Sequence, residues 1–450
     1  MSDERTIERA LAGMKRAGAV QADAVLVRGE QLDTRVRGDE IDFVQQSQTR
    51  TLGLRAFVDG EGGLCQATTS TSDLADASID ELCDRTVDLA RATAPDPHAG
   101  LPDGGYASDL PDLGLFDPAD LPWKVDERIE AARSAERAAR AVDPRITNSE
   151  GSEARCRSAQ IAYGNSAGFL GAYPQASYAL YSSPLAEADG EKQTDYWYDT
   201  SHTLAGLEPA EQIGRIAGER AVRRLGARPV ATCEVPVIFE GRVAASLLQH
   251  VIGCVSGYAL YRGSSFLQGR LGETIASPLV TIVDDGRLPG GLGSKPFDGE
   301  GLPTRRTAIV SEGKLEAYLY DAYSARKLGA ASTGSATRGA GAPPGVGPTN
   351  LWLEPGRGSL DELIADTPRG FLVTELMGMG FNAVTGDYSR GAGGIWIEDG
   401  RLSHPVQEVT IAGNLGPMLE AIDAVAGDLE WRGRVAAPSL RIARMTVAGA

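Results

Sequence analysis

The stretch FLVTELMGMGFNAVTGDYSRGAGGIWIEDGRLSHPVQEVTIAGNL, residues 371–415, carries the strongest structural signal in this chain. It opens with an apolar run, 371–376, that has the length of a strand. Further on, alternation over 394–398, the turn dipeptide Asp399-Gly400 and the run 401–411 are typical of a β-hairpin. We therefore expect a β-rich core built around this hairpin.

Six glycines between 378 and 394 interrupt the pattern, and glycine allows backbone conformations that other residues avoid. We predict that a polar loop lies between the strands and contacts a peptide or a partner protein, because loops of this kind often carry function. The alternative is a solvated loop in which the glycines only turn corners. The candidate contact residues are Asp387, Tyr388, Ser389 and Arg390.

Outward from this stretch, the chain divides into regions of different pattern. Its 450 residues are long for a single core, so we expect two or three domains. Six prolines over 94–123 and the absence of periodicity predict a linker, with bounds 99–123. The predicted fold class is α+β, with an N-terminal α/β domain (1–98), a middle helix-plus-strand domain (124–229) of short antiparallel strands, and a large, mainly antiparallel C-terminal domain (230–450).

Charge and hydropathy exclude several classes of partner. The formal net charge is −17, from 44 Lys and Arg against 61 Asp and Glu, and we find no basic stripe that would attract nucleic acid. The longest apolar stretch, 243–255, is too short to cross a bilayer, and the N-terminus has no secretory signal pattern. Five scattered cysteines suit a reducing compartment. We expect a cytoplasmic protein that binds neither nucleic acid nor membrane.

A set of motifs in the C-terminal half resembles the TldD/PmbA family. They keep the family order, and within it FLVTELMG, VTGDYSRGA and PSLRIA are similar to the TldE (PmbA) branch and not to TldD. The motifs are CEVPVIFEGRVAASLL at 233–248, GRLGETIASPLVTIVDDG at 269–286, FDGEGLPT at 297–304, YSARKLG at 323–329, VTGDYSRGAGGIWIEDG at 384–400 and TIAGNL at 410–415.

The family's catalytic subunit holds zinc with a His-Glu-x-x-x-His helix and a later cysteine. Three protein ligands leave a position for water, and the glutamate takes the proton of that water. Aligned without gaps, the two histidine positions fall on Leu248 and Gly253 and the base position falls on Gln249. The last cysteine is Cys254, so no C-terminal thiolate follows. We therefore expect no catalytic residue and no metal ligand in this chain.

Two weaker arrangements stay open. His250 and Cys254, four residues apart, form one residual pair with metal-binding side chains, although a hydrogen-bonded structural histidine is the more common situation. Asp387 and Ser389 with the distant His404 are the candidates for a Ser/His/Asp triad, because such triads are set by geometry and not by order. The loop 329–348, rich in small residues, is expected to be disordered or ordered only by contact.

The resemblance implies a non-catalytic TldE-like subunit that forms a heterodimer with a TldD-like zinc metallopeptidase. Such a complex cleaves unfolded or modified peptides, and zinc is expected only in the partner. Two alternatives remain: a self-sufficient hydrolase with an atypical metal-free site, and a homodimeric peptide-binding protein.

Overall fold

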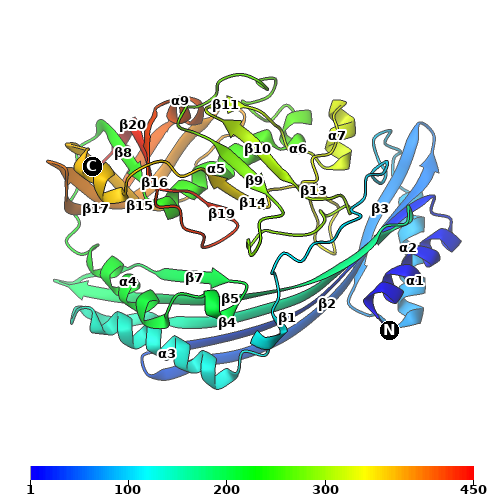
Figure 1. Ribbon diagram of the computed structural model, residues 1–450, viewed down its shortest axis with the longest axis horizontal. Helices are drawn as coiled ribbons and strands as arrows, with labels where there is room; N and C mark the ends of the chain where they lie inside the picture. The colour runs from blue at the N-terminus through cyan, green and yellow to red at the C-terminus, as the bar shows by residue number, and fades with distance from the viewer. Residues whose placement is uncertain (1, 450) are drawn as a thin grey trace.

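The computed structural model describes residues 2–449 and confirms a mixed α+β fold with a β-rich C-terminal domain. A long, curved sheet lies below a more compact C-terminal domain (Figure 1). The elements of the first half are α1 (Asp3–Ala17), β1 (Gln21–Arg37), β2 (Glu40–Gly60), β3 (Gly63–Thr71), α2 (Asp76–Arg91), α3 (Val125–Ala141), β4 (Ile146–Asn165), β5 (Leu170–Ala188), β6 (Glu191–Thr194), β7 (Trp197–Ser201) and α4 (Ala210–Val222).

The long sheet has the antiparallel order β3-β2-β1-β4-β5-β6, with β7 also paired to β5. Since β1 pairs with both β2 and β4, the regions 1–98 and 124–229, predicted as separate domains, share one continuous sheet. The prediction of short strands in this half was wrong. Here β4 and β5 have 20 and 19 residues.

Alternation along the strands separates the two faces of the long sheet. On the even-numbered face of β1, Leu26 is buried under α1 and α2 at one end, and Leu32 is buried under α3 and α4 at the other. Successive side chains in a strand point to opposite faces. The odd-numbered residues of β1 and β4 therefore face the C-terminal domain.

The C-terminal domain follows at residue 233. Its main sheet has the order β17-β16-β15-β8-β20-β18, and an additional pairing of β17 with β20 closes it on itself. Among the strands within residues 2–449, β15–β8 and β14–β19 are the only parallel pairs, so the predicted mainly antiparallel arrangement is confirmed. The elements are β8 (Cys233–Phe239), α5 (Gly241–Val255), α6 (Gly257–Tyr261), β9 (Ile282–Asp285), β10 (Arg306–Ser311), β11 (Lys314–Leu315), α7 (Ala322–Leu328), β12 (Ala336–Thr337), β13 (Gly345–Val346), β14 (Asn350–Leu353), α8 (Leu360–Ala365), β15 (Arg369–Met377), β16 (Asp387–Glu398), β17 (Arg401–Asn414), α9 (Leu415–Glu420), β18 (Ile422–Val425), β19 (Val435–Ala436) and β20 (Leu440–Ala448).

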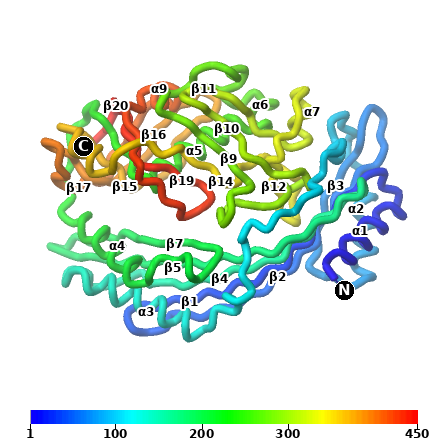
Figure 2. The backbone as a smooth tube through the Cα atoms, viewed as in Figure 1, coloured from blue at the N-terminus to red at the C-terminus, as the bar shows by residue number. Residues whose placement is uncertain are grey.

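The segment predicted as a linker, 99–123, ties the two halves together. It runs between the long sheet and the C-terminal domain (Figure 2). The Ala107 amide donates to the Gly301 carbonyl at 2.9 Å, and the Ala176 amide donates to the Leu115 carbonyl at 2.8 Å. The segment thus contacts both halves.

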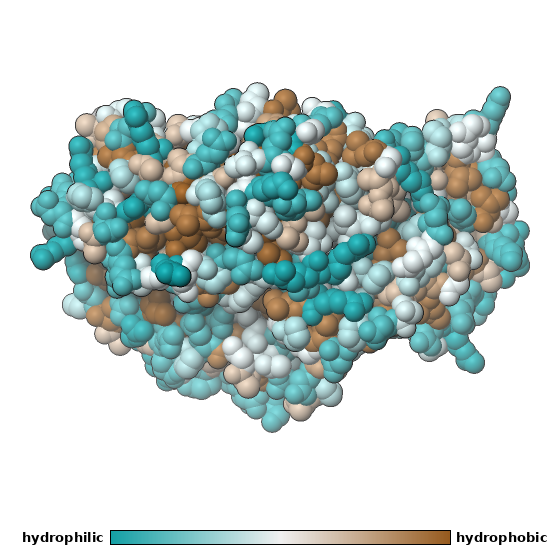
Figure 3. All heavy atoms as spheres, turned by 45° about the horizontal axis from the view of Figure 1, so that its top comes forward, coloured by the Kyte–Doolittle hydropathy of each residue, from teal (hydrophilic) through white to brown (hydrophobic). Residues whose placement is uncertain are grey.

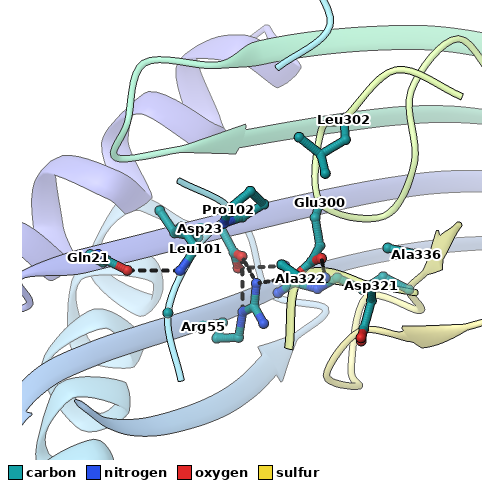
Figure 4. A network of polar contacts seen from close by, with 12 residues as sticks. Gln21, Asp23, Arg55, Leu101, Pro102, Glu300, Leu302, Asp321, Ala322 and Ala336 are labelled. Atoms are coloured by element: carbon teal, nitrogen blue, oxygen red, sulfur yellow. Dashed lines mark hydrogen bonds and ion pairs between the residues drawn. The ribbon is translucent and has the colours of Figure 1, made fainter. Parts of the chain in front are cut away.

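A buried ionic network joins the first half to the C-terminal domain (Figure 4). Asp23 on β1 accepts from Arg55 on β2, with a bond of 3.0 Å from Nε, and from Arg338 of the C-terminal domain. Glu300 lies 3.5 Å from Arg55 and accepts from the Ala322 amide at 2.8 Å. Burial by itself would raise the pKa of Asp23, but Arg338 and Arg55 outweigh burial and hold that pKa below its ordinary value. Burial raises the pKa of Glu300 to about 7.

The same contact orders the loop 329–348, which the sequence left as disordered or ordered by contact. The side chain of Arg338 is 2% exposed. The backbone of Ala340 lies so close to β2 that a Cβ at Gly53 would stand 1.5 Å from the Ala340 carbonyl oxygen. This loop is therefore ordered by packing on the long sheet.

No helix within residues 2–449 is long and apolar enough to cross a bilayer. In the view of Figure 3, hydrophobic residues gather in small groups among hydrophilic ones.

Candidate functional site

The helix α5 occupies the place where the family resemblance puts the zinc motif. It follows directly on β8, whose residues 237–239 are fully buried, and nine of its fifteen residues are buried in the C-terminal core. Leu248 belongs to this core and is 3% exposed. Gln249, in contrast, is exposed and lines a hollow. The buried residues of α5 therefore anchor the helix in the core, and Gln249 faces the surface.

This α5 hollow has a volume of about 400 Å³ and is enclosed by three segments. The first is the edge strand β7, the second is the first half of α5, and the third is the stretch 428–439 before β20. Among its lining residues are Trp197, Tyr198, Arg242, Gln249, Arg432 and Arg434.

Arg432 fixes the wall of the α5 hollow. Its guanidinium lies 4.2 Å from the ring centre of Trp197, and it donates to the Tyr198 carbonyl and to Glu208, both at 2.9 Å. A planar guanidinium can stack on an aromatic ring and donate in its own plane at the same time. The Arg432 side chain thus links the 428–439 stretch to β7.

A pair of oppositely charged groups lies at the N-terminus of α5. Arg220 donates to both carboxylate oxygens of Glu240, at 2.7 and 3.1 Å. Burial by itself would raise the pKa of Glu240, yet the neighbouring Arg220 and Arg223 bring it below its ordinary value. Glu240 is therefore a charged structural partner of α4 and does not serve as a free proton acceptor.

The tetrad 387–390 is not a loop, and this expectation was wrong. Its residues are the first four of β16 and pair with 411–414 of β17. Alternation puts Tyr388 in the core, 1% exposed, and leaves Asp387 and Ser389 exposed on the other face. The neighbouring glycines serve close backbone approach instead: a Cβ at Gly380 would stand 1.6 Å from the Ser389 carbonyl oxygen. Peptide or partner contact by these residues stays a prediction.

Tyr388 and Arg390 instead point toward His250 of α5. The His250 ring lies 4.3 Å from the ring of Phe381 and 5.9 Å from that of Tyr388, measured between centres. Burial, together with the nearby charge of Arg390, lowers the pKa of His250 to about 4. Burial raises the pKa of Tyr388 to about 12. At neutral pH this cluster holds a neutral imidazole beside one cation.

These residues do not fit a zinc ion. His250 Nε2 is buried and has no hydrogen-bond partner within residues 2–449, so it is the one candidate ligand atom. Burial raises the pKa of the Cys254 thiol to about 12, whereas zinc binds the thiolate. Arg390 adds a repelling charge, and residues 2–449 contain no group of three His, Cys, Asp or Glu side chains that could hold a metal.

The candidate Ser/His/Asp residues are not brought together. Ser389 pairs with Ala412, while His404 lies eight residues earlier on β17, about 27 Å along a strand. The His404 ring contacts the neighbouring Ser403 hydroxyl at 3.1 Å. No proton relay from Ser389 through His404 can form in this arrangement.

Sequence reasoning missed the aromatic and arginine residues of the α5 hollow. The signals were present as a Tyr-Trp-Tyr run at 196–198 and an Arg-Gly-Arg run at 432–434. Their meaning depends on β7 and the 428–439 stretch meeting in space, and the two lie more than 200 residues apart in the chain.

Comparison with known proteins places all three parts of the chain in one family. Models of the C-terminal domain, central domain and domain 1 of PmbA/TldA metallopeptidases match residues 232–449, 118–225 and 22–90. Metalloprotease PmbA from Escherichia coli O157:H7 is 37% identical over 430 residues, which cover 95% of this chain and 92% of that protein.

Two solved structures share the fold. A candidate modulator of DNA gyrase from Bacteroides thetaiotaomicron superposes with a TM-score of 0.92 at 29% identity and full coverage of both chains. TldE from Thermococcus kodakarensis gives a TM-score of 0.89 at 22% identity, covering 98% of this chain and 99% of that one, which supports the fold alone. From these matches and from its architecture, the chain belongs to the PmbA/TldA metallopeptidase family.

Proposed function

We propose that this chain is the non-catalytic, TldE-like subunit of a two-subunit cytoplasmic metallopeptidase, and that it shapes the chamber in which a zinc-bearing TldD-like partner cleaves peptides. The proposal rests on the residues that α5 has at the positions of the zinc motif. Where the resemblance places two histidines and a glutamate, the helix has a core leucine, Leu248, a glycine, Gly253, and an amide, Gln249. A hydrolytic zinc needs three protein ligands and a base near its water.

The surface around β16 supports a partner on this side of the molecule. Met379 is 92% exposed and Val384 is 55% exposed in the turn that precedes β16. Asp387 and Ser389 are exposed immediately after that turn. Exposed apolar side chains with polar neighbours are typical of protein interfaces. In this proposal the partner subunit covers the turn about a pseudo-twofold axis.

Co-expression with the TldD-like protein of the same genome tests the assignment. We expect a stable complex by size-exclusion chromatography, with cleavage of unfolded casein that EDTA abolishes. We expect no cleavage by this chain alone. A matched control replaces the metal-site glutamate of the TldD-like partner by glutamine, which keeps the complex and removes the activity.

Three outcomes would contradict the proposal. One is a homodimer that ignores the TldD-like protein, which would favour a peptide-binding protein. Another is chelator-insensitive cleavage by the isolated chain that disappears in Ser389→Ala, which would favour a self-sufficient hydrolase. The third is stoichiometric zinc in the isolated chain by elemental analysis.

A further inference from the structure

The polar face of the long sheet is hollowed along its length where the C-terminal domain stands over it. A second hollow, of about 590 Å³, shares Arg432, Gly433 and Arg434 with the α5 hollow. A third, of about 260 Å³, shares Arg157, Ser177 and Thr200 with the second. Adjacent hollows share lining residues, so we treat the three together as one groove, here called the sheet groove. Its lining residues come mainly from β1, β4, β5 and β7, from α5 and from the stretch 428–439. In Figure 1, β4, β5 and β7 lie below β19 and α5.

Strand alternation explains why the floor of the sheet groove is polar. On β4, Ala154 and Cys156 are buried in the core beneath the helices, so Arg155 and Arg157 point to the opposite face. Antiparallel pairing sets Arg157 opposite Ser177 of β5 and Gln31 of β1. The two arginines thus stand side by side on the groove floor.

In the second and third hollows of the sheet groove, positive side chains outnumber negative ones, whereas the α5 hollow is also lined by Glu240, Asp428 and Glu430. Arg157 and Arg434 are exposed and make no ion pair or side-chain hydrogen bond within residues 2–449, whereas Arg155 pairs with Glu153 and Arg432 pairs with Glu208 and Glu430. Among the described residues lining the second hollow, Glu30 is the sole acid, and it accepts from Gln46 and Gln48 at 2.8 and 3.2 Å. In a chain of net charge −17, two unmatched cations face one groove.

Aromatic side chains form the wall beside these arginines. The rings of Tyr181, Tyr196 and Tyr198 stack in sequence, with centres 5.5 and 6.1 Å apart. The Arg242 guanidinium covers Tyr196 at 4.5 Å. Tyrosine supplies apolar contact area together with a polar tip, and a fixed stack loses little conformational freedom when a ligand packs on it.

We propose that the sheet groove binds acidic, extended segments of the peptide substrate, with ligand carboxylates on Arg157 and Arg434 and the tyrosine wall against the ligand's apolar parts. The inference rests on the proposed function, which makes a peptide the ligand. A peptide fits better than a nucleic acid, because two unpaired guanidinium groups can match a few carboxylates but leave most of a long row of phosphates unmatched and repelled by a chain with 17 excess negative charges. A few carboxylates in a groove with two unpaired guanidinium groups form charge-assisted hydrogen bonds instead.

Fluorescence anisotropy on the full chain tests this inference. The probes are three labelled 12-residue disordered peptides of equal length, one rich in glutamate, one rich in lysine and one neutral, with a single-stranded oligonucleotide as a fourth. We expect the acidic peptide to bind most tightly and its affinity to fall as salt rises. Replacing both cations, as Arg157→Gln with Arg434→Gln, should weaken acidic-peptide binding about tenfold, since each charge-assisted contact contributes modestly.

The matched control removes the same charge elsewhere. Arg85 and Arg401 are exposed, make no ion pair within the described residues and line none of the three hollows. The double variant Arg85→Gln with Arg401→Gln should therefore bind the acidic peptide as the wild type does. A loss that is equal in both double variants would overturn the inference, because it would reflect net charge alone.

Other results would also overturn it. These are equal binding of acidic and basic peptides by the wild-type chain, or tighter binding of the oligonucleotide than of the acidic peptide. The wild-type comparison needs no variant, so it decides the question even if the double variant fails to fold. Failure of the proposed function is seen separately, as absence of a complex with the TldD-like protein.

Discussion

The two ends of the long sheet differ in whether the charged side chains on the face toward the C-terminal domain are buried and paired. We call them the closed end, near Asp23, and the open end, near Gln31. At one end, Asp23 and Arg55 are buried on the face that meets the C-terminal domain, and Arg338 and Glu300 complete a closed network. About eight residues further along β1, near Gln31, the same face opens into the sheet groove, where Arg157 stays exposed and unmatched. The same strand face thus carries a buried, paired set of charges at one end and an exposed, unpaired arginine further along.

The buried, paired charges and the exposed, unpaired charges contribute differently to the stability of the fold. Buried charges must be paired, because removing them from water costs several kcal/mol per ion. Breaking such a pair is therefore felt by the whole fold. Exposed charges keep their hydration, so they contribute little to stability and remain free to meet a ligand.

The largest expected loss of stability comes from breaking the buried ionic network at Asp23. Asp23→Ala leaves Arg55 and Arg338 buried without their shared carboxylate, and we expect a loss of about 3–5 kcal/mol in the free energy of unfolding. Urea denaturation followed by circular dichroism measures it. The control Asp33→Ala changes an acid on the same face of the same strand that is only half-buried. Equal effects of the two variants would break the comparison.

The pH dependence of stability should also originate at the closed end. Burial raises the pKa of Glu300 from 4.5 to about 7, so the folded chain binds this proton more tightly than the unfolded chain does. This contribution to stability is fully present below pH 4.5 and is lost as pH rises through 7. At about 1.4 kcal/mol per pKa unit, its loss is of the order of 3 kcal/mol.

Glu300→Gln removes this titration. Relative to the variant, the wild type should become less stable between pH 5 and 8, as measured by urea midpoints at both values. A difference between the two proteins that does not change with pH would contradict the raised pKa.

Two glycines of the long sheet, one near each end, differ in how much space a Cβ atom would have. At the closed end, the Cβ of Gly53→Ala would meet the Ala340 carbonyl at 1.5 Å, so the backbone must move and we expect a loss of about 1–3 kcal/mol. At the open end, the Cβ of Gly29→Ala would meet the flexible Thr49 hydroxyl at 3.1 Å. Thermal melts should show a clearly smaller change for Gly29→Ala, and the reverse order would show that the loop does not pack as described.

The smallest effect is expected in the sheet groove. Arg157→Gln with Arg434→Gln should change the free energy of unfolding by less than about 0.5 kcal/mol, since neither side chain has a partner to lose within the described residues. The same denaturation series measures it beside Asp23→Ala. A large loss of stability would mean that these arginines hold the fold and are not free for a ligand.

Particular elements show how far sequence reasoning reached. The hairpin was predicted correctly: β16 and β17 pair across Asp399-Gly400, and both turn residues have positive φ, 50° and 70°. The tetrad beside it was wrongly predicted as a loop because its glycines suggested flexibility. In the fold, those glycines let strands approach, as at Gly394, where a Cβ would lie 1.9 Å from the Leu372 carbonyl oxygen.

By itself, the sequence determined the α+β class, the hairpin turn and the family resemblance, because alternation, turn dipeptides and motifs are local in the chain. Only the tertiary structure decided which charges are matched. Asp23 meets Arg338 across 315 residues, and Arg157 shares a hollow with Arg434 across a similar separation. These residues meet because the long sheet is curved and the C-terminal domain packs on it. No local pattern records that geometry, since electrostatic energy depends on distance and burial in space and not on separation along the chain.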